Sequence, residues 1–181
     1  MDDDSHSTER QRNLWAPWRM EYIDALNAGP DGTCFLCSYG EQASEDRTNL
    51  VLWRGRHSFV VMNRFPYTGG HCMIAPYDHV SDLAGLSAES FGEMFAFLRD
   101  TQRVLSKAIG AEGFNIGINI GRCAGAGLPG HLHVHVVPRW SGDTNFMAVF
   151  GGVRVLPQAL DATYEKIAEV GREMDLPKTS S

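Results

Sequence analysis

The sequence predicts an α+β domain in which a mainly antiparallel sheet is flanked by helices. Short segments rich in branched and aromatic residues form two groups along the chain, and a long amphipathic segment separates the groups. A doubly wound parallel sheet would instead need strands and helices that alternate one by one. We therefore expect one domain over residues 13–175, followed by a C-terminal tail at 176–181.

The N-terminal part of the chain precedes the first predicted strand. Residues 1–12 carry almost no apolar side chains and are predicted to form a flexible arm. Residues 14–26 have apolar side chains at helical spacing after Pro17, which suits the first turn of a helix. Glycine, proline and polar residues dominate residues 27–49, so this stretch is predicted to be turn-rich.

The strands and the central helix are predicted from side-chain periodicity. A helix is predicted over 87–109, with Ser87 as its N-cap. Its apolar stripe consists of Phe91, Met94, Phe95, Leu98 and Leu105. The strands predicted from branched and aromatic residues are 49–53, 57–63, 71–76, 113–120 and 131–137.

The C-terminal part of the predicted domain follows the last of these strands. Two more strand pieces are predicted within residues 145–156. Pro157 is predicted to begin a final helix that continues to about residue 173. The side chains expected to face inward from this helix are those of Leu160, Tyr164 and Ile167.

Composition excludes several classes of protein. The 181 residues include 22 acidic and 16 basic side chains, and the net charge of −6 argues against a dedicated nucleic-acid binder, which needs a concentrated positive field. No apolar run approaches the roughly 18 residues that span a bilayer. The acidic N-terminus is unlike a secretory signal, so a cytoplasmic protein without a membrane partner is expected. In a reducing compartment, metal binding or burial is a better expectation for cysteines than disulfides.

The segment HLHVHVV carries three alternating histidines, His131, His133 and His135. On a strand these imidazoles would share one face, but the first and third Cα atoms would lie about 13 Å apart at about 3.3 Å per residue. Both cannot reach one metal ion, so one imidazole is expected to act as nucleophile or acid–base group while its neighbours flank it along a substrate. The alternative is a solvated sheet face. Main-chain N–H groups of the adjacent glycine-rich loop at 121–130 could hold phosphate oxygens.

This pattern resembles the histidine triad (HIT) superfamily. The likeness extends to MNRFPYTGGHCMIAP upstream, NIGINIG before the loop and PRWSGDTNF after the histidines, and it covers roughly residues 34–150. The tryptophan-rich LWAPWRMEYI is most similar to the bacterial branch that includes diadenosine tetraphosphate phosphorylases. The resemblance implies a HIT fold and a sheet that is joined edge to edge in a homodimer. A segment with Trp15 and Trp18 would either extend this assembly or pack on its own domain.

The resemblance also implies the catalytic residues. His133 would attack the α-phosphorus to form a covalent nucleotidyl-histidine, His135 would bond a phosphate or leaving-group oxygen, and His71 would support them. A neutral imidazole is a competent nucleophile at pH 7, so this route requires no catalytic metal. The implied function is cleavage of a dinucleoside polyphosphate such as diadenosine tetraphosphate. The alternatives are a nucleoside phosphoramidase and a zinc-stabilised nucleotide-binding module with vestigial activity.

The implied substrate contacts each have a structural alternative. Asn63 matches a residue that holds ribose hydroxyls, and Asn119 a polar residue near the phosphates, although either could be a turn or capping residue. The loop before the triad lacks the Gln or Ser of many family members, so its contacts would come from main-chain N–H groups. The remaining implied contacts are Phe35 and Leu36 at an adenine pocket, and Gly125, Ala126 and Gly127 at the phosphates.

A second candidate site begins with Cys34 and Cys37, a C-x-x-C pair that supplies half of a zinc site. The resemblance implies that His79 and His131 complete a structural zinc centre. Zinc on His131 would hold the segment that carries His133. A redox dithiol and unligated buried thiols are the alternatives.

Overall fold

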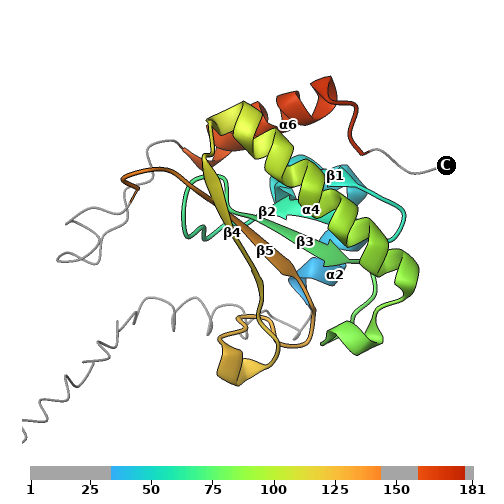
Figure 1. Ribbon diagram of the computed structural model, residues 1–181. Coiled ribbons are helices and arrows are strands. Elements are labelled where there is room, and N and C mark those ends of the chain that lie inside the picture. The colour runs from blue at the N-terminus through green and yellow to red at the C-terminus, as the bar shows by residue number, and fades with distance from the viewer. Residues whose placement is uncertain (1–33, 144–158, 178–181) are drawn as a thin grey trace, which may run out of the picture.

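The architecture is an antiparallel five-stranded sheet with helices on both faces (Figure 1). The computed structural model describes residues 34–143 and 159–177. The strand order is β1-β2-β3-β5-β4, and every neighbouring pair is antiparallel. The strands are β1 (Val51–Arg54), β2 (Ser58–Met62), β3 (Cys72–Pro76), β4 (Gly113–Ile118) and β5 (Val134–Arg139). The α+β prediction is therefore confirmed.

Helix α4 (Ala88–Ile109) connects the two strand groups. It begins after Ser87, whose side-chain oxygen accepts a hydrogen bond from the Ser90 N–H, as the sequence predicts for an N-cap. The chain then forms β4 and returns as β5, which inserts between β3 and β4. The histidine-bearing segment therefore enters the interior of the sheet and not its edge.

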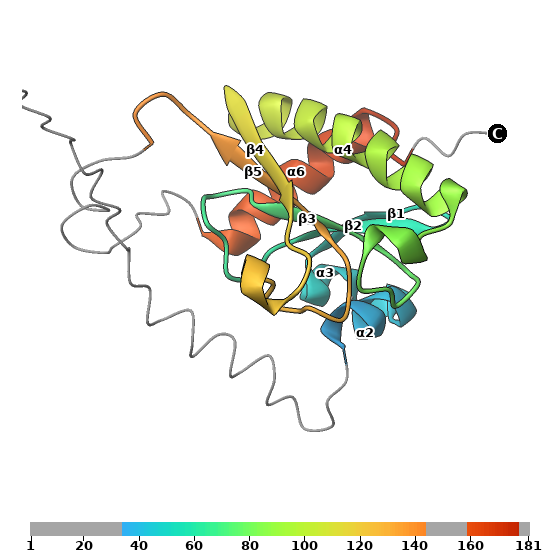
Figure 2. The ribbon, with the colours of Figure 1, turned by 60° about the horizontal axis from the view of Figure 1, so that its bottom comes forward.

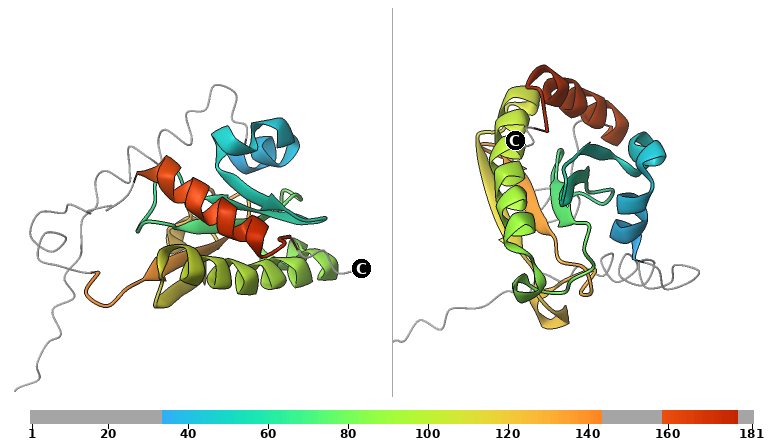
Figure 3. Two further views of the ribbon diagram at one scale, coloured as in Figure 1. Left: turned by 90° about the horizontal axis from the view of Figure 1, so that it is seen from above. Right: turned by 90° about the vertical axis from the view of Figure 1, so that its right-hand side faces the viewer.

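Two apolar clusters cover the two faces of the sheet, which lies between the helices in Figure 3. Helices α4 and α6 (Leu160–Glu173) lie on one face, where they cover Ile74 of β3. Helix α2 (Phe35–Glu41), with Leu36 fully buried, packs on the other face against Met73. Because neighbouring residues of a strand point to opposite faces, β3 contributes to both clusters.

The long helix is predicted correctly in position, but one feature of its apolar stripe is wrong. Met94 and Leu105 are buried, whereas Phe91 and Phe95 are 44% and 50% exposed. The buried positions on the same helix include Phe97, Val104 and Ala108 instead. The helix therefore faces the sheet with a stripe that is rotated relative to the predicted one.

Two other local predictions differ from the structure. The stretch predicted to be turn-rich contains α2 and the short helix α3 (Asp46–Asn49), because Leu36 provides a buried anchor on the sheet. Strand β5 begins three residues later than predicted, since the Leu132 N–H donates to the main-chain oxygen of Val80 outside the sheet. No helix in the described ranges has the length and apolar character needed to cross a membrane. The helix predicted at 14–26, the strand pieces at 145–156 and the arm at 1–12 lie outside the described residues.

The turn before β3 requires a glycine at position 70. Gly70 has φ of +79°, and a Cβ atom there would lie 2.5 Å from Cδ1 of Ile109. Both the left-handed backbone and the close approach of α4 exclude a side chain. This turn leads directly into His71, so the fit between Gly70 and α4 contributes to the position of that histidine.

Glu93 of α4 holds the turn between β1 and β2. Its carboxylate accepts hydrogen bonds from the main-chain N–H groups of Arg56 and His57 and from the Ser58 hydroxyl, at 2.7–2.8 Å. Burial raises the pKa of Glu93, but these donors outweigh burial and the net pKa is lowered from 4.5. The charged form is therefore stabilised in the folded state.

We expect Glu93→Gln to lower the free energy of unfolding by about 1 kcal/mol at pH 7, after allowance for solvent screening. A lowered folded-state pKa contributes stability that is present above the unfolded-state pKa and is lost as pH falls through the folded-state pKa. The difference between the variant and the wild type should therefore shrink as pH falls below about 4.5. Urea unfolding at several pH values measures it, with the exposed Glu169→Gln as control. A difference that is independent of pH would contradict the assignment.

Candidate active site and metal centre

The histidine segment links two clusters of side chains at the end of the sheet where β5 begins. Figure 2 shows α2 near the start of β5, on the side where the connection from β4 arrives. His131 and His133 precede β5, whereas His135 lies within β5 opposite Met73. The imidazole of His131 faces one cluster, and those of His133 and His135 belong to the other.

His133 is held in one orientation by a main-chain hydrogen bond. Its side chain is 6% exposed, and Nδ1 lies 2.8 Å from the main-chain oxygen of His131. A carbonyl can only accept, so Nδ1 carries the proton and Nε2 carries the lone pair. Burial lowers the pKa of His133, although the bond to the His131 oxygen opposes this effect. The ring is therefore neutral at pH 7 and presents a nucleophilic nitrogen.

The other two predicted catalytic histidines lie beside it. The ring centroids of His133 and His135 are 4.8 Å apart, and His71 Nε2 is 3.1 Å from His135 Nδ1. His71 is completely buried. The structure thus brings all three predicted catalytic imidazoles into one cluster, although only one of them comes from β5.

Asn63 lies against this cluster. Its Nδ2 is 3.3 Å from His71 Nδ1, and its Oδ1 accepts a hydrogen bond of 2.9 Å from the Phe65 N–H. The Tyr67 ring also stacks on His71, with centroids 4.8 Å apart. Sequence patterns gave no reason to select Tyr67, because its contact with His71 depends on how the turn between β2 and β3 folds back.

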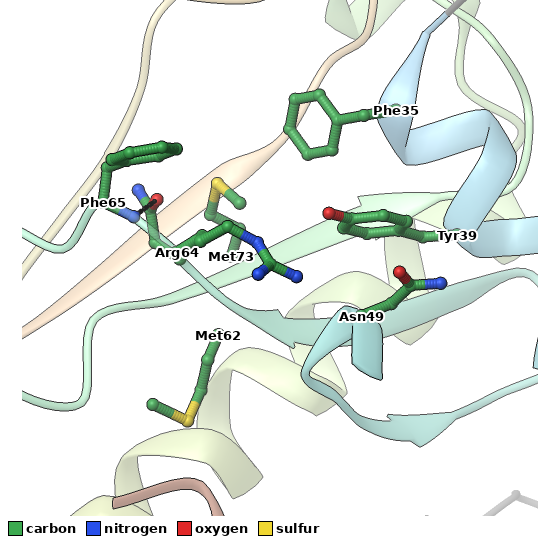
Figure 4. Close-up of a pocket in the computed structure, with 8 residues that line it drawn as sticks. Phe35, Tyr39, Asn49, Met62, Arg64, Phe65 and Met73 are labelled. Atoms are coloured by element: carbon green, nitrogen blue, oxygen red, sulfur yellow. Dashed lines mark hydrogen bonds between the residues drawn. The ribbon is translucent and has the colours of Figure 1, made fainter. Parts of the chain in front are cut away.

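A cavity of about 150 Å³ lies between α2 and the strands (Figure 4). Its lining includes Asn63, which contacts His71, and Met73, which lies opposite His135. Phe35 lines this cavity, whereas Leu36 is buried in the core and does not. Tyr39 was not predicted; its spacing of four residues from Phe35 places both on one face of α2, with ring centroids 5.4 Å apart. The lining residues are Phe35, Tyr39, Asn49, Met62, Asn63, Arg64, Phe65 and Met73. The cavity is apolar with a few polar groups, as small-molecule sites commonly are.

The glycine-rich connection between β4 and β5 is braced by its own contacts. Asn119 Nδ2 donates to the main-chain oxygen of Gly125 at 3.5 Å, and the Ala126 N–H donates to the oxygen of Gly121 at 3.4 Å. Gly125 has φ of +81°, a conformation that favours glycine. Asn119 therefore shapes the loop that leads to the histidines.

The second cluster unites the four predicted metal ligands. Cys34 Sγ is 3.2 Å from His131 Nδ1, and Cys37 Sγ is 3.2 Å from His79 Nδ1 and 3.4 Å from His131 Nδ1. All four ligand atoms lie within 4.8 Å of one another. Tetrahedral zinc bonds of about 2.0–2.3 Å require ligand atoms separated by roughly 3.3–3.8 Å. The three contacts of 3.2–3.4 Å are close to this range, and the widest separation, up to 4.8 Å, would need to shorten by about 1 Å on one ion.

The electrostatics of the cluster also suit a dication. Burial, followed by the proximity of Cys34, raises the pKa of Cys37 to about 11, so without a cation this thiol holds its proton. A bound metal reverses that balance by stabilising thiolates. His131 Nε2 donates to the main-chain oxygen of Pro76 at 2.9 Å, which leaves the Nδ1 lone pair facing the sulfurs. Burial lowers the pKa of His131 and keeps this ligand neutral.

An antiparallel sheet that carries three alternating histidines next to a glycine-rich connection defines the histidine triad class of proteins. The HIT domain model matches residues 44–142, and the chain belongs to the HIT family. The chain is 37% identical over 164 residues to the AP-4-A phosphorylase of Mycobacterium tuberculosis, covering 88% of this chain and 84% of that protein. It is 34% identical over 93 residues to the asymmetrical bis(5'-nucleosyl)-tetraphosphatase of Schizosaccharomyces pombe, covering 51% and 50% respectively.

A solved structure of similar fold contains zinc. The zinc-bound histidine triad family protein of Mycobacterium smegmatis superimposes with a TM-score of 0.64 and 26% identity, covering 79% of this chain and 96% of that one. The fold predicted by resemblance is therefore confirmed. The Cys₂His₂ cluster together with this zinc-bound relative supports a metal centre in the present chain.

We expect Cys34→Ala to lose bound zinc and to lower the melting temperature by about 5–10 °C, because metal binding contributes to the free energy of folding. Elemental analysis of the purified protein and a thermal melt measure the two effects. Cys123→Ala removes an exposed cysteine outside the cluster and should change neither. Full metal content in the Cys34 variant would exclude the proposed ligand set.

Proposed function

We propose that this protein cleaves dinucleoside polyphosphates, such as diadenosine tetraphosphate, through a nucleotidyl intermediate on His133. The observation that carries the proposal is the neutral, oriented imidazole of His133, whose Nδ1 donates to a main-chain oxygen and whose ring lies beside that of His135. The nearby cavity is lined by Asn63, which contacts His71. The similarity to an AP-4-A phosphorylase over most of both chains supports the same substrate class.

The chemistry follows from the orientation of the two rings. Nε2 of His133 attacks the α-phosphorus, a P–N bond forms, and the bond to the bridging oxygen breaks with its electron pair leaving on the departing nucleotide. A hydrogen-bond donor on His135 stabilises the negative charge that develops on that oxygen. Water or inorganic phosphate then attacks phosphorus, and the P–N electron pair returns to Nε2.

The substrate contacts are assigned from position. In the proposed complex the base would lie in the cavity against Phe35. Asn63 Oδ1 accepts one hydrogen bond from the Phe65 N–H, and its second lone pair would accept from a ribose hydroxyl. Main-chain N–H groups of the loop before His131 would hold phosphate oxygens. The loop residues assigned to this role are Gly125, Ala126 and Gly127, with Asn119 bracing them.

We further propose that the Cys₂His₂ cluster holds a structural zinc ion. Its ligands come from α2, from the segment after β3 and from the segment before β5, so one ion would tie three parts of the chain together. Dimerisation through β4 is also proposed, because β4 is an edge strand and exposes Ile116. A paired edge would remove the unsatisfied main-chain groups that such a strand presents.

Product analysis tests the function directly. With diadenosine tetraphosphate and inorganic phosphate we expect ADP with ATP if phosphate completes the turnover, and AMP with ATP if water does. An adenosine phosphoramidate is assayed in parallel, and its preferential cleavage would identify a phosphoramidase instead. Binding without turnover of either substrate would leave a nucleotide-binding module and would overturn the proposal.

We expect His133→Ala to lower turnover by at least about 10³-fold while the fold is retained, because no other group supplies the nucleophile. Acid-quenched wild-type protein should carry phosphorus-labelled nucleotide, and the variant should carry none. His57→Ala removes a histidine in the turn between β1 and β2 and is the matched control. If the His133→Ala variant still carried labelled nucleotide, the nucleophile would be a residue other than His133.

A further inference from the structure

We propose that Asn63 is a positioning residue that sets the direction of the hydrogen bonds running through His71 to His135. This inference rests on the proposed function for its kinetic consequence, but not for its structural content. It assigns to the Asn63 amide nitrogen a role that is separate from the ribose contact of the amide oxygen.

The orientation of the amide is fixed by a main-chain donor. The Phe65 N–H lies 2.9 Å from Asn63 Oδ1, and an N–H group requires an acceptor, so the oxygen must face Phe65. The nitrogen, Nδ2, then faces His71 Nδ1 at 3.3 Å. The Asn63 side chain is 6% exposed, so bulk water competes little for either atom.

A second N–H group donates to the same nitrogen, Nδ1 of His71. The Tyr67 N–H lies 3.2 Å from His71 Nδ1, and the Tyr67 ring stacks on the imidazole at 4.8 Å with an interplanar angle of 20°. Both Asn63 Nδ2 and the Tyr67 N–H can only donate, so His71 Nδ1 must hold its lone pair toward them. A neutral imidazole has one proton, which is therefore on Nε2 of His71.

The tautomer of His71 determines the tautomer of His135. His71 Nε2 donates to His135 Nδ1 over 3.1 Å, so the proton of neutral His135 is on its own Nε2. His133 has the opposite arrangement, because its Nδ1 donates to the main-chain oxygen of His131 at 2.8 Å. The two neighbouring imidazoles thus offer a lone pair on His133 and an N–H group on His135, as attack and leaving-group stabilisation require.

The alternative direction would disable this division. With a proton on His71 Nδ1, its Nε2 would accept from His135 Nδ1, and both His133 and His135 would present lone pairs. Two lone pairs facing a polyphosphate repel its oxygens and stabilise no developing charge. Asn63 and the Tyr67 N–H exclude this state because it would set donors against a donor in a buried site.

Nitrogen NMR of ¹⁵N-histidine-labelled protein reads the proton positions without substrate. We expect His71 and His135 as Nε2–H tautomers and His133 as the Nδ1–H tautomer in the wild type. A proton on Nδ1 of neutral His71 in the wild type would overturn the inference. Because the spectrum is recorded on protein without substrate, it tests the tautomer assignment separately from the proposed function.

The matched variants are Asn63→Leu and Asn115→Leu. Asn63→Leu removes one of the two donors to His71 Nδ1, so the spectrum of this variant should show a measurable population of His71 with its proton on Nδ1. Asn115 lies on β4 and accepts a hydrogen bond from Arg139, so Asn115→Leu should leave the histidine tautomers unchanged. For Asn63→Leu, kcat for diadenosine tetraphosphate should fall by about 10-fold or more. For the nitrophenyl ester of AMP, kcat should fall by less than about threefold, because the nitrophenolate leaving group disperses its own charge. Equal losses on both substrates, or unchanged tautomers, would contradict the inference.

Discussion

The hydrogen bond from His133 Nδ1 to the main-chain oxygen of His131 is the interaction on which the site depends. It joins the proposed nucleophile to a residue whose own ring faces the two cysteines. A neutral hydrogen bond of this kind contributes only about 1 kcal/mol to stability, so its importance is orientational. Without it the ring of His133 could rotate and present a protonated nitrogen to phosphorus. A metal ion at the Cys₂His₂ cluster would therefore act on the proposed nucleophile through one peptide group.

Strand β3 supports both ends of the histidine segment. His71 immediately precedes β3 and bonds His135, while the oxygen of Pro76 at the other end of β3 accepts from His131. The antiparallel pairing of Ile74 with Val134 aligns β3 with the histidine segment. A shift of this register would displace His135 from His71 and His131 from the Pro76 oxygen at the same time. One strand thus fixes the distance between the metal cluster and the catalytic histidines, and the insertion of β5 between β3 and β4 makes that distance rigid.

Periodicity was sufficient to predict the fold class and the long helix, and a C-x-x-C pair indicated half of a metal centre, because these signals are local. The resemblance to the HIT family, and not spacing, supplied His71, His79 and the division of the alternating histidines between the two clusters. The start of β5 was predicted too early, since Leu132 bonds Val80 in a distant loop. The packing of α2 through Leu36 is equally long-range. The contact of Asn63 with His71 spans only eight residues, but it depends on how the turn between β2 and β3 folds back.

The distribution of hydrogen bonds explains why one nitrogen is available for the proposed chemistry. Buried polar atoms cost free energy unless they are paired, and His71 and His131 have partners for both ring nitrogens. His133 has a partner for Nδ1, whereas its Nε2 has none among the residues that the structure describes. Burial lowers the pKa of this ring, so the remaining lone pair stays unprotonated near neutral pH. The surrounding bonds thus satisfy the neighbouring imidazoles and leave a single reactive nitrogen facing the substrate side.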